Sequence, residues 1–241
     1  MYRNLNPDRI VETGQALHRR ISERFADSSL GRVAGELLSV AEEASAMSRW
    51  LSQPHWPLRV LAGLGIVAMI TVVASAFLTV RTQFSFSSMA ELLQGSEAAI
   101  NEVVFLGIAS FFLLTLEVRL KRRRALKAIH VLRSIAHIID MHQLTKDPEA
   151  LLGRGQNTSS SPKRVLTPFE LTRYLDYCSE LLSIISKIAA IYVQQFDDPV
   201  TLSAVNDVEE LTTGLSRKIW QKIVILDRSM SPDKPTGGLT A

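Results

Sequence analysis

The sequence has little of what secreted proteins and most enzymes need. Its 241 residues include a single cysteine, Cys178, so no internal disulfide can form and a reducing compartment is predicted. It contains no Gly-rich phosphate loop, nucleophile elbow, kinase set or metalloprotease motif, so we expect neither an enzyme nor a bound cofactor. No segment alternates apolar and polar residues for long enough to predict a sheet. These absences favour an all-α protein.

Charge is missing from one long segment. Residues 60–80 hold no charged side chain, and a helix rising ~1.5 Å per residue needs about 20 such residues to cross a bilayer core. This predicts a transmembrane span at about 58–80. A second apolar block, residues 103–116, is shorter and is also typical of a buried core helix. We favour a second span at about 99–118, because the block would otherwise have to pack elsewhere.

Basic residues are scarce between the two predicted spans and dense after the second. The connection, residues 81–98, has only Arg81, whereas a cluster follows the second span: Arg119, Lys121, Arg122, Arg123, Arg124 and Lys127. Basic residues beside a span resist translocation, so both termini of this predicted multi-pass membrane protein are expected to be cytoplasmic. The cluster should contact lipid headgroups, at roughly 1 kcal/mol per residue on an anionic surface. We therefore expect membrane lipids as partners and no nucleic acid.

Helical periodicity covers most of the remaining chain. We predict a cytoplasmic N-terminal arm (1–56), a hairpin of two spans (57–120), a cytoplasmic helical bundle (121–230) with a flexible loop (153–166), and a disordered tail (231–241). Thr167, Pro168 and Glu170 form a predicted capping box, and Asp147-Pro148 and Asp198-Pro199 are typical of helix starts. The apolar stripes of these helices need one another for burial. The arm either completes the bundle or meets a neighbouring subunit.

Two polar faces on the spans allow two interpretations. Thr71, Ser75 and Thr79 share a face of the first span, and Gly107, Ser110 and Glu117 share a face of the second. Small and hydroxyl residues let helices pack closely in lipid, which we favour; the alternative is a polar line facing a pore. Glu117 is also expected to pair with Lys121, one helical turn further on.

Among the polar residues of the predicted spans, Glu102 would cost the most free energy to bury in lipid. An ionised carboxylate within the bilayer costs a few kcal/mol unless it meets water or a partner, and a ring of them could select cations. The alternative, which we favour, is that the span begins after Glu102 and leaves it in the outer headgroups. His130, His137 and Asp140 could in principle hold zinc, but we predict ordinary polar histidines and no metal site.

Four stretches carry a resemblance to known proteins: "HRRISERFADSSLGRVAGELLSVAEEA", "HIIDMHQLTKDP", "RYLDYCSELLSIISKIAAIY" and "LTTGLSRKIWQKI". They resemble a group of uncharacterised bacterial two-span inner-membrane proteins, which implies a bacterial inner membrane and no particular activity. The predicted architecture is also similar to SLATT-type two-transmembrane effectors of bacterial conflict systems, which are thought to form membrane-permeabilising pores.

Two functional hypotheses follow from the sequence. The first is a membrane-anchored helical module that oligomerises, or docks a cytoplasmic protein partner, through its bundle. The second is a homo-oligomeric pore or ion channel lined by the second span. We expect a homo-oligomer, which the second hypothesis requires and the first allows.

Overall fold

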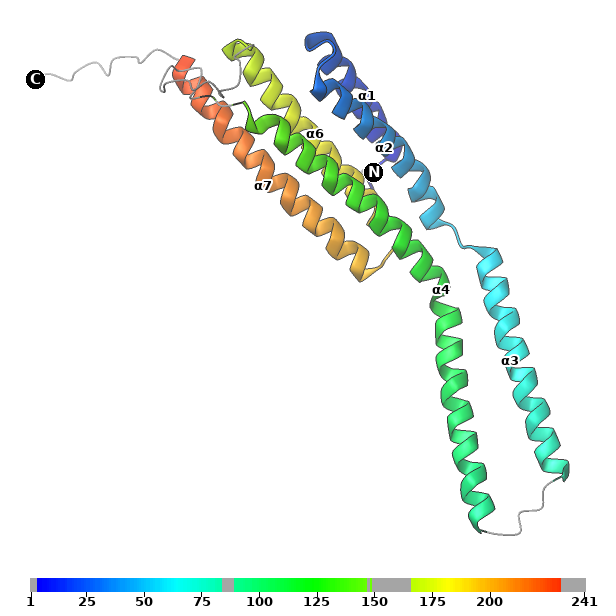
Figure 1. Cartoon of the computed structure of the whole chain (residues 1–241). Helices are drawn as coiled ribbons and strands as arrows, with labels where there is room; N and C mark the ends of the chain where they lie inside the picture. Colours follow the sequence, from blue (N-terminus) through cyan, green and yellow to red (C-terminus); the bar gives the residue numbers. More distant parts are fainter. Residues whose placement is uncertain (1–3, 84–88, 147, 149–165, 231–241) are drawn as a thin grey trace, which may run out of the picture. The chain divides into compact units, whose positions relative to one another are not determined.

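The protein is all-α in the part of the chain that the structure describes. This computed structural model describes residues 4–83, 89–146, 148 and 166–230. Its helices are α1 (Pro7–Arg24), α2 (Ser29–Ser52), α3 (Trp56–Gln83), α4 (Met89–Leu144), α6 (Pro168–Gln194) and α7 (Pro199–Met230), shown in Figure 1. The chain divides into two units, Met1–Ser52 with Ala125–Ala241, and Gln53–Arg124; α4 contributes to both.

In the first unit, side chains at the helix starts satisfy free backbone N–H groups. The Thr167 hydroxyl accepts from the backbone N–H of Glu170 (3.2 Å), and the Glu170 carboxylate accepts from that of Thr167 (2.8 Å). This confirms the predicted capping box at the start of α6. The Asp198 carboxylate accepts from the backbone N–H (2.9 Å) and hydroxyl (2.8 Å) of Thr201, which confirms the predicted start of α7. The two long helices of the bundle therefore begin where local chemistry predicts.

The first unit buries its apolar stripes in one core. Each helix presents aliphatic side chains at three- and four-residue spacing, as expected for amphipathic helices in a bundle. Fully buried examples are Leu17, Ile21, Leu37, Leu132, Ile139, Leu182 and Ile185. Figure 1 shows these helices running along one another with the carboxyl-terminal part of α4, and α6 packs against α1, α2 and α7. The core thus draws on every helix of this unit.

The N-terminal arm packs on α6 of its own chain. The ring of Phe25 contacts Tyr174 and Tyr177 edge-on, with centroids 5.6 and 6.2 Å apart. Arg20 forms an ion pair with Glu180 at 2.6 Å. Aromatic edge-to-face pairs add about 0.5–1.5 kcal/mol each beyond the area they bury. The arm is therefore held by specific contacts within one chain.

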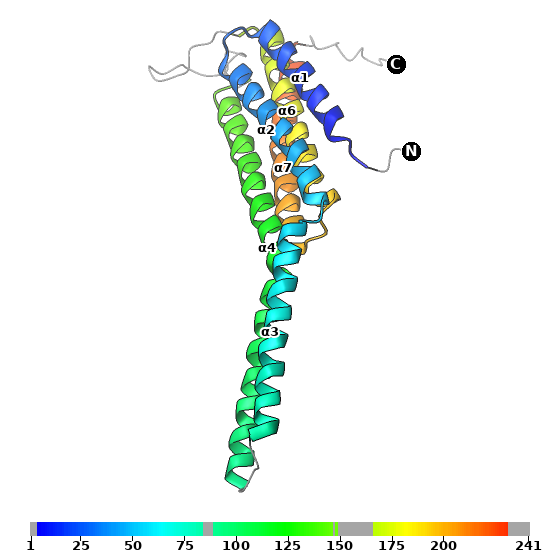
Figure 2. The same ribbon diagram turned by 90° about the vertical axis from the view of Figure 1, so that its right-hand side faces the viewer.

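The second unit is a pair of antiparallel helices, α3 and the first part of α4 (Figure 2). By length and composition, two helices of the described chain are long and apolar enough to cross a membrane. α4 is one helix from Met89 to Leu144, so it runs without interruption from the second apolar block into the bundle.

The predicted connection 81–98 is largely helical, which corrects its length. Residues 81–83 still belong to α3, and α4 already begins at Met89. The segment 89–99 is rich in Ala, Leu, Glu and Gln, which are strong helix formers and allow α4 to begin well before the apolar block. The predicted cap at Asp147, nearly all of the loop 153–166 and the tail 231–241 lie outside the described residues.

Candidate functional site

A charged cluster centred on Glu117 lies where α3 begins and the apolar part of α4 ends. The Glu117 carboxylate accepts from Arg59 Nε at 2.7 Å and from Lys121 Nζ at 3.0 Å. It also accepts from the backbone N–H of His55 at 3.2 Å. Only 13% of the Glu117 side chain and 9% of the Lys121 side chain are exposed. The cluster is therefore a partly buried network in which two cations share one carboxylate through charge-assisted hydrogen bonds.

Lys121 joins this cluster to the segment before α3. Its ammonium donates to the backbone carbonyl of Gln53 at 2.8 Å as well as to Glu117. Pro54 and Pro57 interrupt the helical backbone here, so α2 ends at Ser52 and α3 begins at Trp56. The carbonyl of Gln53 has no helical N–H partner within such a break, and Lys121 supplies a donor. The network thus ties the bend before α3 to α4.

The sequence predicted part of this network and missed the rest. The predicted pair of Glu117 with Lys121 is confirmed. Arg59 and the backbone of residues 53–55 were not predicted, because they come from a segment about 60 residues away. A signal was present, since Arg59 is the one charged residue in the block 58–80 and an antiparallel hairpin brings that end close to Glu117.

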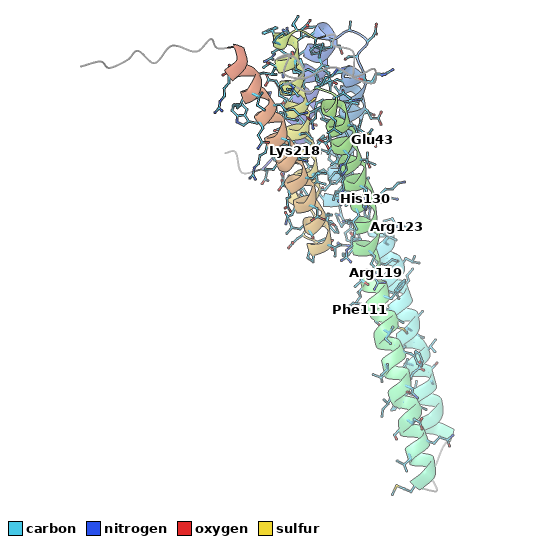
Figure 3. All side chains as sticks on the ribbon, turned by 60° about the vertical axis from the view of Figure 1, so that its left-hand side comes forward. Glu43, Phe111, Arg119, Arg123, His130 and Lys218 are labelled. Atoms are coloured by element: carbon cyan, nitrogen blue, oxygen red, sulfur yellow. The ribbon has the colours of Figure 1, made fainter. Side chains whose placement is uncertain are left out.

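The basic cluster after Glu117 has two kinds of members. Lys121 was expected to contact lipid headgroups, but it is buried and engaged with Glu117 and Gln53. Arg122 is half-buried, whereas the other members are exposed: Arg119, Arg123, Arg124 and Lys127. The guanidinium of Arg119 lies 5.1 Å from the Phe112 ring, so its aliphatic stem runs along the apolar surface of the helix. Figure 3 shows Phe111, Arg119 and Arg123 at successive levels of α4.

The two predicted polar faces do not meet each other. An added Cβ on Gly65 would lie 3.0 Å from Leu113, so Gly65 is on the side of α3 that meets α4. Thr71 and Ser75 are exposed, and their hydroxyls donate to carbonyls of their own helix, Val67 and Val72, at 2.8 Å. The side chain of Thr79 lies outside the described part of the chain.

On α4, the predicted face is split. Ser110 and Glu117 lie on the side that faces α3, with Leu106 and Leu113. Gly107 is exposed, and an added Cβ there would have no neighbour within 4 Å. Close packing through small residues therefore involves Gly65 rather than the face that contains Thr71 and Ser75.

A groove of about 410 Å³ separates part of α3 from α4. Its lining is apolar except for one hydroxyl: Ile66, Met69, Ile70, Val73, Ala74, Phe77, Leu106 and Ser110. A groove of this chemistry suits hydrocarbon, either an acyl chain or the apolar side chains of another helix. It offers few groups that could coordinate an ion.

The histidines of α4 are not brought together as a metal site. His130 and His137 are exposed, and the Asp140 carboxylate accepts from the side-chain amide of Gln143 at 2.7 Å. Among the residues that the structure describes, no group of three or more His, Cys, Asp or Glu side chains could hold a metal ion. His130 instead lines a groove of about 290 Å³ with Arg133 of α4 and Asp207 of α7.

Comparisons with known proteins identify no family. The chain matches no protein-family model, no curated protein and no solved structure. Any function must therefore be argued from the chain itself.

Proposed function

We propose that this protein is a two-span membrane anchor that holds a helical bundle at the cytoplasmic face of a bacterial inner membrane. There the bundle docks a second copy or a cytoplasmic protein partner. The observation that carries the proposal is the outward placement of apolar side chains on α3 and on the first part of α4. Val103, Phe105 and Phe111 are 69%, 70% and 62% exposed, respectively.

This exposure disfavours a helix pair in the core of a water-soluble protein. Only 6% and 0% of the most apolar windows of the two long helices are buried within the chain, whereas a core helix is mostly buried. Water-soluble monomers rarely expose continuous apolar patches larger than a few hundred Å². Lipid removes this conflict, because every backbone group of a helix is already paired and its side chains can face hydrocarbon.

The charged cluster supports a membrane boundary at one end of these helices. Where the apolar surfaces end, Glu117 pairs with both Arg59 and Lys121, and the three side chains together keep one positive charge. Arg119, Arg123 and Arg124 lie just beyond and are exposed, as expected for residues that reach anionic headgroups. Basic residues in this position favour the cytoplasmic side. The resemblance to bacterial two-span inner-membrane proteins supports the same location.

The bundle offers apolar side chains for docking. Val131, Ile138 and Met141 of α4 are 41%, 42% and 67% exposed and recur at helical spacing. On α7, Trp220 is 64% exposed beside a groove that is otherwise lined largely by serine and threonine hydroxyls. Exposed aromatic and aliphatic side chains of this kind are enriched at protein interfaces.

Membrane extraction and topology mapping test the anchor. The full-length chain should stay in the pellet after alkaline carbonate washing of membranes, and a reporter fused after residue 241 should be active only in the cytoplasm. Release by carbonate, or a periplasmic reporter, would contradict the anchor.

The number of subunits in lipid nanodiscs tests the docking role. We expect the triple variant Val131→Ser, Ile138→Ser and Met141→Ser to lose bound copies or partner. Asn206→Ser, at an exposed position of α7 away from the groove beside Trp220, serves as the control. Equal assembly of both variants would remove the docking role and leave the anchor standing.

A further inference from the structure

The charged cluster shows which residues of α3 lie beside which residues of α4. The pair Arg59–Glu117 defines one level of the two antiparallel helices. The same register continues further along, because a Cβ added to Gly65 would lie 3.0 Å from Leu113, and Ile66 and Ile70 share a groove with Leu106 and Ser110. Because both helices rise ~1.5 Å per residue, equal steps away from Arg59 and back from Glu117 reach the same level.

The register between α3 and α4 allows the depth of Glu102 in the membrane to be estimated. Glu102 lies about 15 residues before Glu117, roughly 22 Å along the helix, and therefore at the level of Ala74. The uncharged stretch of α3 continues beyond that level to residue 80, for about another 9 Å. If the cluster at Glu117 marks the inner boundary of a ~30 Å hydrocarbon core, Glu102 falls inside that core and not in the outer headgroups.

Glu102 lies among exposed apolar side chains of α4. The residue is exposed, and its neighbours Ile100 and Val103 are apolar and 63% and 69% exposed. None of the described residues pairs with this carboxylate. A carboxylate facing hydrocarbon costs a few kcal/mol, so residues of this kind usually face a partner or water.

We propose that Glu102 marks an interface in the membrane at which it meets Glu102 of a second copy of this chain. The inference rests on the membrane location proposed above. Glu102 is exposed and lies one helical turn before Leu106 and two before Ser110, the two residues of α4 that line the groove between α3 and α4. A neighbouring helix can fill this apolar groove, and a two-fold axis beside it brings identical residues together.

Self-association satisfies the carboxylates chemically. When two carboxyl groups meet in a low-dielectric site, one keeps its proton and donates it in a hydrogen bond to the other. Both groups then gain a partner, and the pair carries one negative charge in place of two. A larger ring would place the same residue around a water-filled path, and that geometry is an outcome of the test below.

Cysteine cross-linking in native membranes tests this contact. The one natural cysteine, Cys178, is fully buried, and burial raises the pKa of its thiol to about 12. We therefore expect Cys178 not to react under mild oxidation. Glu102→Cys should form a disulfide-linked dimer under mild oxidation, since Cα atoms within about 4.4–6.8 Å can be bridged. Val104→Cys, close to the same level but on another side of α4, should not.

Labelling with a membrane-impermeant maleimide fixes the depth independently. Ser96→Cys, nearer the start of α4, should react from outside, whereas Glu102→Cys should be protected. Equal reaction of both would overturn the depth. If Glu102→Cys is protected but does not cross-link preferentially, the contact between copies is overturned. If Glu102→Cys is labelled readily and cross-links into particles larger than dimers, a water-filled path replaces the proposed contact. Carbonate release of the wild-type chain would instead remove the proposed membrane location.

A second variant separates the carboxylate from the fold. Glu102→Ala should weaken self-association in nanodiscs by roughly three- to thirtyfold, the range of one hydrogen bond between membrane helices. Val104→Ala should leave it unchanged. An unchanged subunit number for Glu102→Ala would overturn the role of the carboxylate even if the copies still contact each other.

Discussion

The two units of this protein are built from the same kind of element and place their apolar side chains in opposite ways. In the bundle, Leu182 and Ile185 are fully buried among neighbouring helices. On the hairpin, Leu114 and Phe105 are 66% and 70% exposed. Amphipathic stripes can be buried by a few neighbours in water, whereas a helix that is apolar all round needs an apolar solvent. The comparison teaches that exposure of apolar groups, more than their number, separates the two units.

The largest effect should come from shortening a core side chain of the bundle. Leu182→Ala should lower the free energy of unfolding of the bundle by about 2–5 kcal/mol, because it removes buried contacts and leaves a cavity. Leu114→Ala on the hairpin should change it by less than about 0.5 kcal/mol. Urea unfolding in mild detergent, followed by circular dichroism, measures both. An equal cost for the two variants would break the comparison.

The charged cluster should respond next. Glu117→Gln leaves Arg59 and the nearly buried Lys121 without their anion, which we expect to cost about 1–3 kcal/mol locally. The backbone N–H of His55 loses its charged acceptor, so hydrogen exchange in residues 53–57 should accelerate roughly tenfold or more. The matched change Glu97→Gln, at an exposed site of the same helix, should leave that exchange unchanged.

A helix cap of the bundle should have a smaller effect. Thr167→Ala removes the hydroxyl that accepts from the backbone N–H of Glu170, leaves the backbone half of the capping box in place, and should cost about 1 kcal/mol. For a unit of this size that is roughly a 2–4 °C fall in Tm, measured by thermal unfolding in detergent. Thr213→Ala, at an exposed position within α7, is the control, and an equal fall for both would contradict a role of the cap.

The smallest effect should appear at alkaline pH. Burial raises the pKa of the Cys178 thiol from 9.0 to about 12, so the folded chain keeps a proton that the unfolded chain releases. The stability contributed by this group is therefore complete below pH 9 and declines as the pH rises towards 12. Between pH 8 and 9.5 the loss should be about 1 kcal/mol or less, and Cys178→Ala should show a shallower decline. Identical pH profiles would show that the thiol does not contribute.

Local chemistry made much of the fold predictable. The starts of α6 and α7 depend on Thr167, Glu170 and Asp198, each within three residues of the group it caps. The uninterrupted course of α4 follows from its helix-forming residues and its apolar stripe. The connection between the apolar blocks was predicted too long, because a polar helical segment and a loop have similar composition.

The charged cluster was less predictable, because it depends on pairing between distant segments. Sequence spacing predicts Glu117 with Lys121 on one helix face, but it does not say which way Lys121 turns. The Lys121 ammonium donates to the backbone carbonyl of Gln53 and is therefore not free to bind a lipid headgroup. Arg59 reaches Glu117 only because the two helices run antiparallel in one particular register.

By itself, the sequence determined which segments are helical and where their caps lie. It also determined which blocks are apolar enough to cross a membrane and where the basic cluster follows them. Each of these properties depends on residues that are close together in the chain. Only the tertiary structure decided that the N-terminal arm packs on α6 of its own chain, that Arg59 and Lys121 close on Glu117, and that Glu102 lies level with Ala74. Those properties depend on the register between helices, which many small contacts set together and which no single local pattern encodes.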